Sequence, residues 1–213
     1  MAASSGDCRQ LRRVDIPAVA PSSPAREVAI DVVASSDDKQ DDDDPALEAV
    51  TGSALHVVAA AGDSQRYLDS AGVICGRARH LLNARNSKGD TPLHCAARAG
   101  NTGMVAHLIK LAGGEDQAIR ALVRAQNKRG ETALHEAVRF GDKEMVRALI
   151  MDGDAGLAGV VANDGTSPLY LASSLAPLHI AQELLHQSVD GLSYSGPDGQ
   201  NALHAAVIHH RGR

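Results

Sequence analysis

The pattern of apolar and polar positions repeats itself from residue 52 onward. Each unit starts with a glycine and runs through a polar residue into a short apolar stretch. The spacings between the leading glycines are 37, 41, 35 and 34 residues, close to one unit of about 33 residues with insertions. This near-constant spacing predicts a repeat array. The five copies read GSALHVVAAAG, GDTPLHCAARAG, GETALHEAVRFG, GTSPLYLASSLA and GQNALHAAVIHH.

Each unit predicts a helix with a defined start. The polar residue ahead of the apolar stretch is Asn or a hydroxyl amino acid, which can accept a hydrogen bond from an unpaired backbone amide. Two units continue with proline at the first helical position, where the missing N–H costs nothing. One leucine per unit is expected to point into the stack. The caps are Ser53, Thr91, Thr132, Ser167 and Asn201, the prolines Pro92 and Pro168, and the leucines Leu55, Leu93, Leu134, Leu169 and Leu203.

A second helix is predicted in each unit. Gly62, Gly100 and Gly141 stand where the first helix should end in a left-handed C-cap. Apolar residues then recur at helical spacing, and turn-forming residues separate the units. The second helices are predicted at 102–111, 143–151 and 179–187, with a further one near 117–124, and the turn tips at 86–90, 127–131 and 163–167.

Composition and charge narrow the class of protein. Aromatic residues make up only 2% of the chain, which suits closely stacked helices better than a large sheet. Residues 1–45 hold five Lys/Arg and ten Asp/Glu, whereas residues 46–213 hold sixteen of each sign. A neutral body without a basic stripe argues against nucleic acid as partner. No signal-peptide core or apolar run of about 18 residues is present, so we expect a soluble chain without direct membrane insertion.

Residues 1–45 are predicted to be a disordered acidic segment. They mix Pro, Ser and Ala with the aspartate run Asp41–Asp44 and offer little to bury. The run could bind a cation or a basic partner; a solvated, self-repelling linker is the favoured interpretation. The stretch 28–33 could form a transient strand. Cys8, Cys75 and Cys95 have no paired spacing, which indicates reduced thiols in a cytosolic compartment.

The stretch TPLHCAARAG at 91–100 resembles the signature of the ankyrin repeat. The resemblance covers 46–213 and implies an all-α solenoid of about five repeats, the last one incomplete, that binds a protein partner in a concave groove and uses no cofactor. It places charged residues at the turn tips and on the first helices toward that partner; ordinary solvated charges are the competing interpretation. The candidate partner-binding residues are Lys88, Asp90, Arg98, Arg129, Glu131, Arg139 and Asp164.

Histidines recur at one position of the repeat, and Tyr170 replaces the fourth. A metal site would need several of them within about 4 Å of one ion, but equivalent positions in a solenoid lie roughly 10 Å apart. The resemblance implies that each imidazole bonds the capping side chain and the backbone of a neighbouring repeat. The recurring histidines are His56, His94, His135 and His204.

The pair His135–Glu136 also begins a zinc-protease helix, but that helix requires a second histidine where this chain has Arg139. Glu136 is interpreted as a variable helix residue. Cys95, beside His94, is expected to be a buried small residue. No phosphate-binding glycine loop or nucleophile turn is present, so no metal site and no enzyme are predicted.

Longer segments, LSYSGPDGQNALHAAV among them, are similar to plant ankyrin proteins of the accelerated-cell-death type. That resemblance implies a role in defence, cell-death or stress signalling, in the cytoplasm or at the cytosolic face of the plasma membrane. Family members also carry a membrane region with several spanning helices, which this sequence does not contain. Two hypotheses follow: a monomeric soluble scaffold, or the truncated cytosolic portion of a multi-pass membrane protein. The last repeat is expected to fray.

Overall fold

The structure is a computed structural model that describes residues 54–113, 116–175, 178–187 and 191–210. The predicted disordered segment, the strand at 28–33 and the cap at Ser53 lie outside the described residues. Within the described ranges the chain is helical, and its only bridge is the isolated pair Ser195 and Asn201. The predicted all-α solenoid is confirmed. No helix in these ranges is long and apolar enough to cross a membrane.

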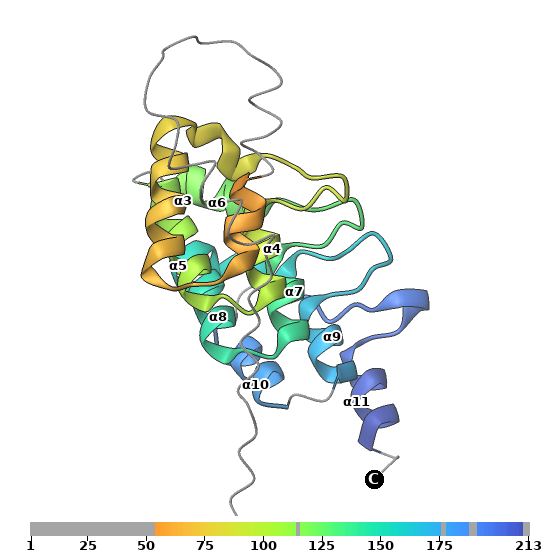
Figure 1. Ribbon diagram of the computed structural model, residues 1–213. Coiled ribbons are helices and arrows are strands. Elements are labelled where there is room, and N and C mark those ends of the chain that lie inside the picture. Colours follow the sequence, from red (N-terminus) through yellow and green to blue (C-terminus); the bar gives the residue numbers. More distant parts are fainter. Residues whose placement is uncertain (1–53, 114–115, 176–177, 188–190, 211–213) are drawn as a thin grey trace, which may run out of the picture.

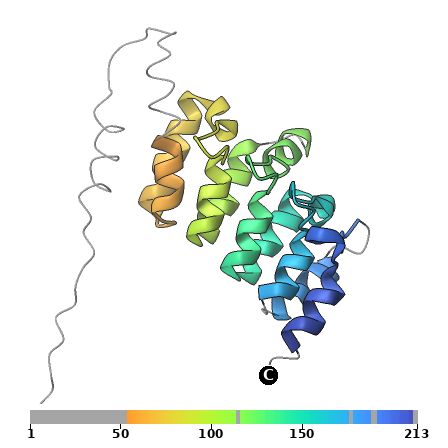
Figure 2. The same ribbon diagram turned by 90° about the vertical axis from the view of Figure 1, so that its right-hand side faces the viewer.

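The first helices of the repeats stand side by side and form one layer of the solenoid. Figure 2 shows them following one another in chain order, from the helix at 54–61 to α11. From α4 onward each of these helices contacts the next one directly. This inner layer consists of the helix at 54–61, α4 (Pro92–Ala99), α7 (Ala133–Phe140), α9 (Pro168–Leu175) and α11 (Ala202–His210).

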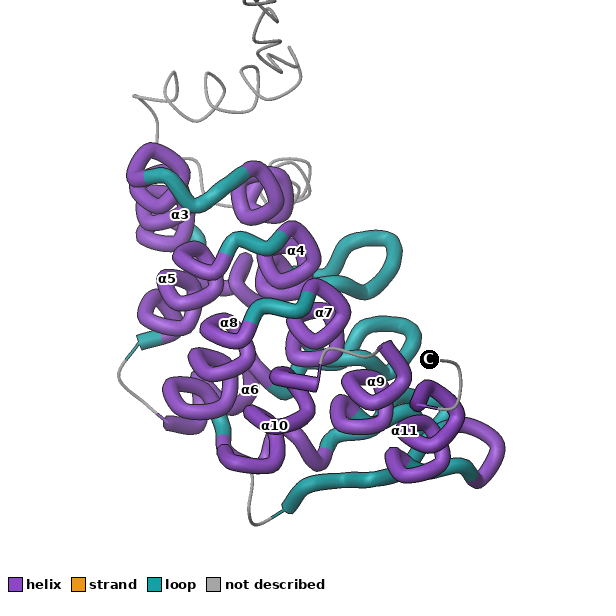
Figure 3. Tube along the Cα trace, turned by 90° about the horizontal axis from the view of Figure 1, so that it is seen from below, coloured by secondary structure: helices purple, strands orange, loops and turns teal. Residues whose placement is uncertain are grey.

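The second helices form an outer layer behind the first, as Figure 3 shows from below. The turns project from the opposite side of the inner layer and stand out at the right of Figure 1. The outer helices are α3 (Gln65–Arg77), α5 (Thr102–Ala112), α6 (Asp116–Val123), α8 (Lys143–Ala148) and α10 (Leu178–Gln187). Short turns of helix join these elements: η1 (Arg79–Asn83), η2 (Leu149–Gly153), η3 (Ala155–Gly159) and η4 (Pro197–Gly199).

The inner helices begin and end where local sequence signals place their caps. Thr91 and Thr132 each form a capping box with the histidine three residues later. Gly100 and Gly141 end α4 and α7 in the left-handed conformation, with φ of 78° and 84°. The prediction of a left-handed cap at Gly62 is wrong, because its φ of 159° is close to extended backbone.

Small side chains let the inner helices approach closely. Ala96, Ala97 and Ala137 are fully buried, and so are the repeat leucines of the first three units. Leu203 is the exception: it is 73% exposed, so the expectation that it points into the stack is wrong. In the described part of the chain no further repeat follows α11, and the face that carries Leu203 therefore has no helix to pack against.

The outer layer matches the predicted helices closely, with one difference. The helix predicted at 143–151 ends at Ala148 and continues as the π-helical turn η2. The N–H of Asp154 reaches back five residues to the carbonyl of Leu149, at 3.1 Å. Buried Glu183 of α10 forms ion pairs with two cations of α8, its oxygens lying 3.2 Å from Lys143 Nζ and 3.3 Å from Arg147 Nε. This charge pairing ties two outer helices together.

Candidate partner-binding face

The recurring histidines join each repeat to the next one. In α4, His94 Nδ1 accepts a hydrogen bond from the backbone N–H of Thr91 at 3.2 Å, and it lies 2.9 Å from the Thr91 hydroxyl. His94 Nε2 lies 2.9 Å from the carbonyl oxygen of Glu131 in the following turn. Because Nδ1 accepts a hydrogen bond, it carries no proton; the proton of the neutral imidazole is therefore on Nε2, which donates to the Glu131 carbonyl.

The same arrangement recurs along the stack. His135 bonds Thr132 through Nδ1 and the carbonyl oxygen of Thr166 through Nε2, at 3.2 Å. His56 Nε2 lies 2.9 Å from the carbonyl oxygen of Asp90. His94 and His135 therefore make both bonds that the resemblance implies, and the imidazoles lie one repeat apart. Across the described residues, no group of three or more His, Cys, Asp or Glu side chains could hold a metal ion.

Burial shifts the pKa values of the buried histidines and of the two described cysteine thiols. It lowers the pKa of His94 and of His135, although bonds to the carbonyls of the next repeat act in the opposite direction. Burial also raises the pKa of the Cys75 and Cys95 thiols to about 11 in each case. Both thiols are therefore protonated at neutral pH, and Cys95 is no activated nucleophile.

In the fourth repeat a tyrosine replaces the histidine and forms a different hydrogen bond to the next repeat. Tyr170 donates its hydroxyl proton to Gln200 Oε1 at 2.8 Å, which again links one repeat to the next turn. A side chain at Gly196 would overlap the Tyr170 ring, so the glycine leaves room for this larger residue. In the last repeat His204 Nδ1 accepts from the backbone N–H of Asn201 at 3.2 Å.

The turns at 86–90 and 127–131 are hairpins, each held by the asparagine at its first position. Asn86 Oδ1 accepts from the N–H groups of Lys88 and Asp90, at 2.9 and 3.0 Å. Asn127 Oδ1 does the same for the two equivalent amides of its own turn. Neighbouring hairpins are also bonded to each other, since Lys128 N donates to the carbonyl of Lys88 at 3.1 Å. The hairpins therefore form one continuous, ordered edge.

Beside this edge lies a network of arginines and buried carboxylates. Arg98 donates from one Nη to Asp90 Oδ2 at 2.8 Å and from the other to Glu136 Oε1 at 2.7 Å. Asn127 also donates to Asp90, at 2.9 Å. Burial by itself would raise the pKa of Asp90, but the bonds from Arg98 and Asn127 outweigh it and lower this pKa to about 2. Arg98 thus links α4 to α7 through the carboxylate of Glu136, and it also pairs with Asp90 of the preceding hairpin.

The network continues into the third repeat. Arg129 lies 2.7 Å from Glu131 Oε2 and 3.6 Å from Glu136 Oε1. Arg139 pairs with Glu131 and lies 3.5 Å from Glu136 Oε2. Burial acts to raise the pKa of Glu131, but the bond and charge of Arg139 hold it below its ordinary value. Glu136 therefore contacts all three arginines of the network, Arg98, Arg129 and Arg139.

The structure divides the candidate partner-binding residues into two groups. Asp90 is fully buried and Glu131 is only 5% exposed, so the expectation that these two face a partner is wrong. Their carboxylates turn inward to hold Arg98 and Arg139, each eight residues further along the chain. The residues that remain exposed are Lys88, Arg98, Arg129, Arg139 and Asp164.

Glu136 is the functional residue that sequence reasoning missed. It is 4% exposed and lies at the centre of the network, whereas the sequence pattern predicts a variable helix residue at this position. Its partner Arg98 is 38 residues away, and no local pattern shows that contact. A spacing signal does exist for the other two acids. In two successive units an acid directly after the hairpin glycine precedes an arginine by eight residues.

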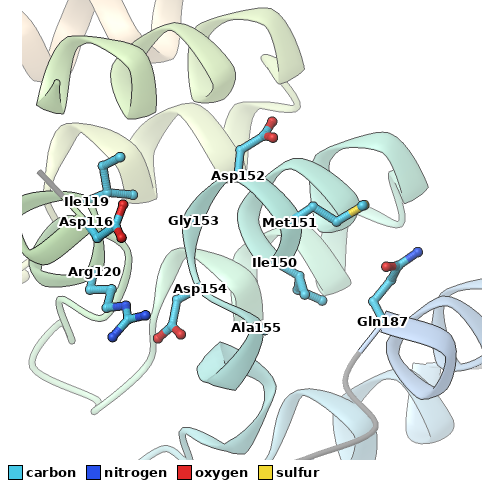
Figure 4. Close-up of a pocket in the computed structure, with 10 residues that line it drawn as sticks. All are labelled: Asp116, Ile119, Arg120, Ile150, Met151, Asp152, Gly153, Asp154, Ala155 and Gln187. Atoms are coloured by element: carbon cyan, nitrogen blue, oxygen red, sulfur yellow. The ribbon is translucent and has the colours of Figure 1, made fainter. Parts of the chain in front are cut away.

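An open depression of about 480 Å³ lies in the outer layer, between α6, η2 and the end of α10. Figure 4 shows Arg120 and Asp154 on facing sides of it, with Met151 and Gln187 further along the rim. Asp154 is already paired with Arg124 and accepts from Gly156 N. The lining contains no serine, cysteine or histidine, so the depression offers no catalytic nucleophile of those types.

Comparison with known proteins agrees with this geometry. A family model described as ankyrin repeats, in three copies, matches residues 55–158 and 113–193. The matched part exceeds half of the chain, and the chain belongs to the ankyrin-repeat family. Comparison with curated proteins gave no match. Ankyrin repeats are protein–protein interaction modules, whose extended surfaces bind partners.

Proposed function

We propose that the chain is a scaffold that binds a protein partner through its hairpin face. The hairpin face consists of the turns at 86–90, 127–131 and 163–167 together with the exposed sides of α4 and α7. It contains all the exposed candidate residues, whereas the depression in Figure 4 belongs to the outer layer. This location is the one that ankyrin arrays use for recognition.

The arginine network is the observation that carries the proposal. The side chains of Arg98, Arg129 and Arg139 are 39%, 65% and 32% exposed, yet each is fixed from below by a buried carboxylate. Such side chains lose little conformational freedom on binding, which favours affinity. Arginine is also enriched among the residues that dominate binding energy in interfaces.

We further propose that this scaffold acts as a monomer in plant defence, cell-death or stress signalling, in the cytoplasm or at the cytosolic face of the plasma membrane. The support is the similarity of the segments around Tyr170 and Gly196 to plant proteins of the accelerated-cell-death type. The close fit of that glycine under the tyrosine ring gives these distinctive residues a physical role.

A second candidate function is that the array is the cytosolic portion of a larger, multi-pass membrane protein. One observation favours it: α11 exposes Leu203, Val207 and Ile208 at 73%, 57% and 64%. Such a face is the kind of surface against which a further repeat packs in a solenoid. A transcript that encodes hydrophobic spanning segments in frame with Arg213 would support this alternative.

Partner capture with matched variants tests the scaffold function. Lys88→Ala with Arg129→Ala alters the hairpin face, and Lys110→Ala on α5 is the control because Lys110 is exposed on the outer layer. We expect proteins captured by the wild-type chain to be lost with the first variant and kept with the control. Capture that is equal for all three chains would contradict binding through the hairpin face.

A further inference from the structure

The two central repeats of the hairpin face carry an excess of positive charge. Residues 84–100 and 125–141 together hold six Lys/Arg and three Asp/Glu, a net charge of +3. The three acids are the buried carboxylates of the arginine network, whereas every one of the cations reaches the surface. The exposed cations are Arg85, Lys88, Arg98, Lys128, Arg129 and Arg139.

Half of these cations are not paired with any carboxylate of the described residues. In the described part of the chain, no ion pair involves Arg85, Lys88 or Lys128, and Arg85 donates to the carbonyls of Gly89 and Gln126 instead. Lys88 and Lys128 lie on adjacent hairpins whose backbones are hydrogen-bonded to each other. The face therefore presents a row of unpaired positive charge next to the arginine network.

The same chain contains a segment of opposite charge. Residues 37–44 read DDKQDDDD, which is six aspartates and one lysine, a net charge of −5. Nine residues, 45–53, lie between Asp44 and Ala54, where the described structure begins, so the connection has ten steps from Cα to Cα. A connection of that length spans at most about 33–36 Å.

A connection of this length is long enough for the acidic segment to reach the hairpins at 86–90 and 127–131. His56, in the first turn of the helix at 54–61, bonds the carbonyl of Asp90, so this helix begins against the 86–90 hairpin. The hairpin at 127–131 is bonded to that one, and successive repeats are spaced by about 10 Å. A tether of this kind gives an effective concentration in the millimolar range, at which several weak charge pairs add up.

We infer that the acidic segment 37–44 binds the cationic row of the hairpin face within the same molecule. The aspartates neutralise Lys88, Lys128 and Arg85 and cover the neighbouring arginines. An external partner then has to displace the segment, which makes it an autoinhibitory element; this last consequence rests on the proposed function. The charge balance accounts for an acidic run placed shortly before the first helix of an array that carries a basic surface.

Zero-length carbodiimide cross-linking of the full chain at low ionic strength tests the inference. We expect amide cross-links from Lys88 and Lys128 to aspartates of 37–44, within the monomer and at a yield independent of protein concentration. Lys110, exposed on the outer layer, serves as the internal control and should form none. The cross-links should disappear at about 0.5 M salt, because exposed charge pairs are screened.

A binding measurement gives an independent readout. A labelled peptide DDKQDDDD is titrated into the full chain and into a variant with the four aspartates Asp41–Asp44 changed to Asn. The vacated face of the variant should bind the peptide at least about tenfold more tightly than the wild type. The substitutions lie outside the repeats, so folding of the array is not at risk.

Three results would overturn the inference: cross-links that reach Lys110 as often as Lys88, cross-linked dimers whose yield rises with concentration, or equal peptide affinities of the two chains. Dimers would show that the segment binds a second copy instead. Neither experiment needs the partner protein. A failed partner capture would therefore contradict the proposed function and leave this inference standing, and the reverse also holds.

Discussion

His94 Nε2 lies 2.9 Å from the backbone carbonyl oxygen of Glu131, so one side chain joins two successive repeats. Glu131, whose carbonyl oxygen accepts this hydrogen bond, also forms an ion pair with the exposed Arg139 through its carboxylate. The hydrogen bond between two repeats and the arginine network thus share one residue, Glu131. Under the proposed function, stability and partner recognition are therefore coupled at Glu131.

Replacement of His94 by alanine should destabilise the array. It leaves the Thr91 amide and the Glu131 carbonyl buried without partners, and each such group costs about 1–3 kcal/mol. We expect the free energy of unfolding in urea to fall by about 2–4 kcal/mol. His186→Ala, at an exposed position of α10, should change it by less than about 0.5 kcal/mol. Equal effects of the two substitutions would refute the role of His94.

Stability should decrease as the pH falls below the ordinary histidine range. The pKa values of His94 and His135 are lowered by burial in the folded chain, so below about 6.5 the unfolded chain binds more protons than the folded one. The stabilisation from the neutral imidazoles is thus present above that pH and is lost below it. Urea unfolding between pH 7.5 and 5.5 measures the slope, and His135→Gln should reduce it. A slope unchanged by that substitution would show that other groups cause it.

Glu136→Ala should weaken the contact between α4 and α7. The substitution removes a buried carboxylate that contacts Arg98, Arg129 and Arg139, but these side chains remain solvated, so the cost should be about 1–2 kcal/mol. Glu144 is the matched control, because it is 69% exposed and its nearest cation, Arg147, lies at 3.8 Å. Thermal unfolding should show Glu144→Ala within about 0.5 kcal/mol of the wild type. A Glu136→Ala variant as stable as this control would mean that the network contributes nothing to stability.

Gly100→Ala should cost more than Gly141→Ala. Both glycines have φ near 80°, which costs other residues about 1–2 kcal/mol. A methyl group on Gly100 would also overlap the ring of Phe140, whereas nothing lies within 4 Å of one on Gly141. The difference in unfolding free energy between the two variants should therefore vanish in a Phe140→Ala background. If the difference persisted in the Phe140→Ala background, the Phe140 ring would not be its cause.

The helices and their joints could be predicted from the sequence because their signals are local. The cap at Thr132, the proline at Pro92 and the left-handed glycine at Gly100 act within one turn of helix and have the same effect in any repeat. The repeat pattern also identifies Tyr170 as a substitute for histidine, although its hydrogen bond to Gln200 depends on the following turn.

The orientation of the charged side chains could not be predicted in the same way. Asp90 and Glu131 occupy turn positions that look exposed, and only the arginines eight residues later show why they turn inward. Leu203 has the same sequence context as Leu134, yet one is 73% exposed and the other fully buried. That difference depends on which element packs on the outer side of each helix, and the local pattern does not contain this information.

Hydrogen exchange of the full chain, with and without a captured partner, tests the central claim most directly. If the hairpin face binds the partner, amides of the turns at 86–90 and 127–131 and of the neighbouring helices α4 and α7 should exchange more slowly in the complex. Amides of the outer helices α5, α8 and α10 should be unchanged. Slower exchange that is confined to the outer helices would contradict recognition through the hairpin face.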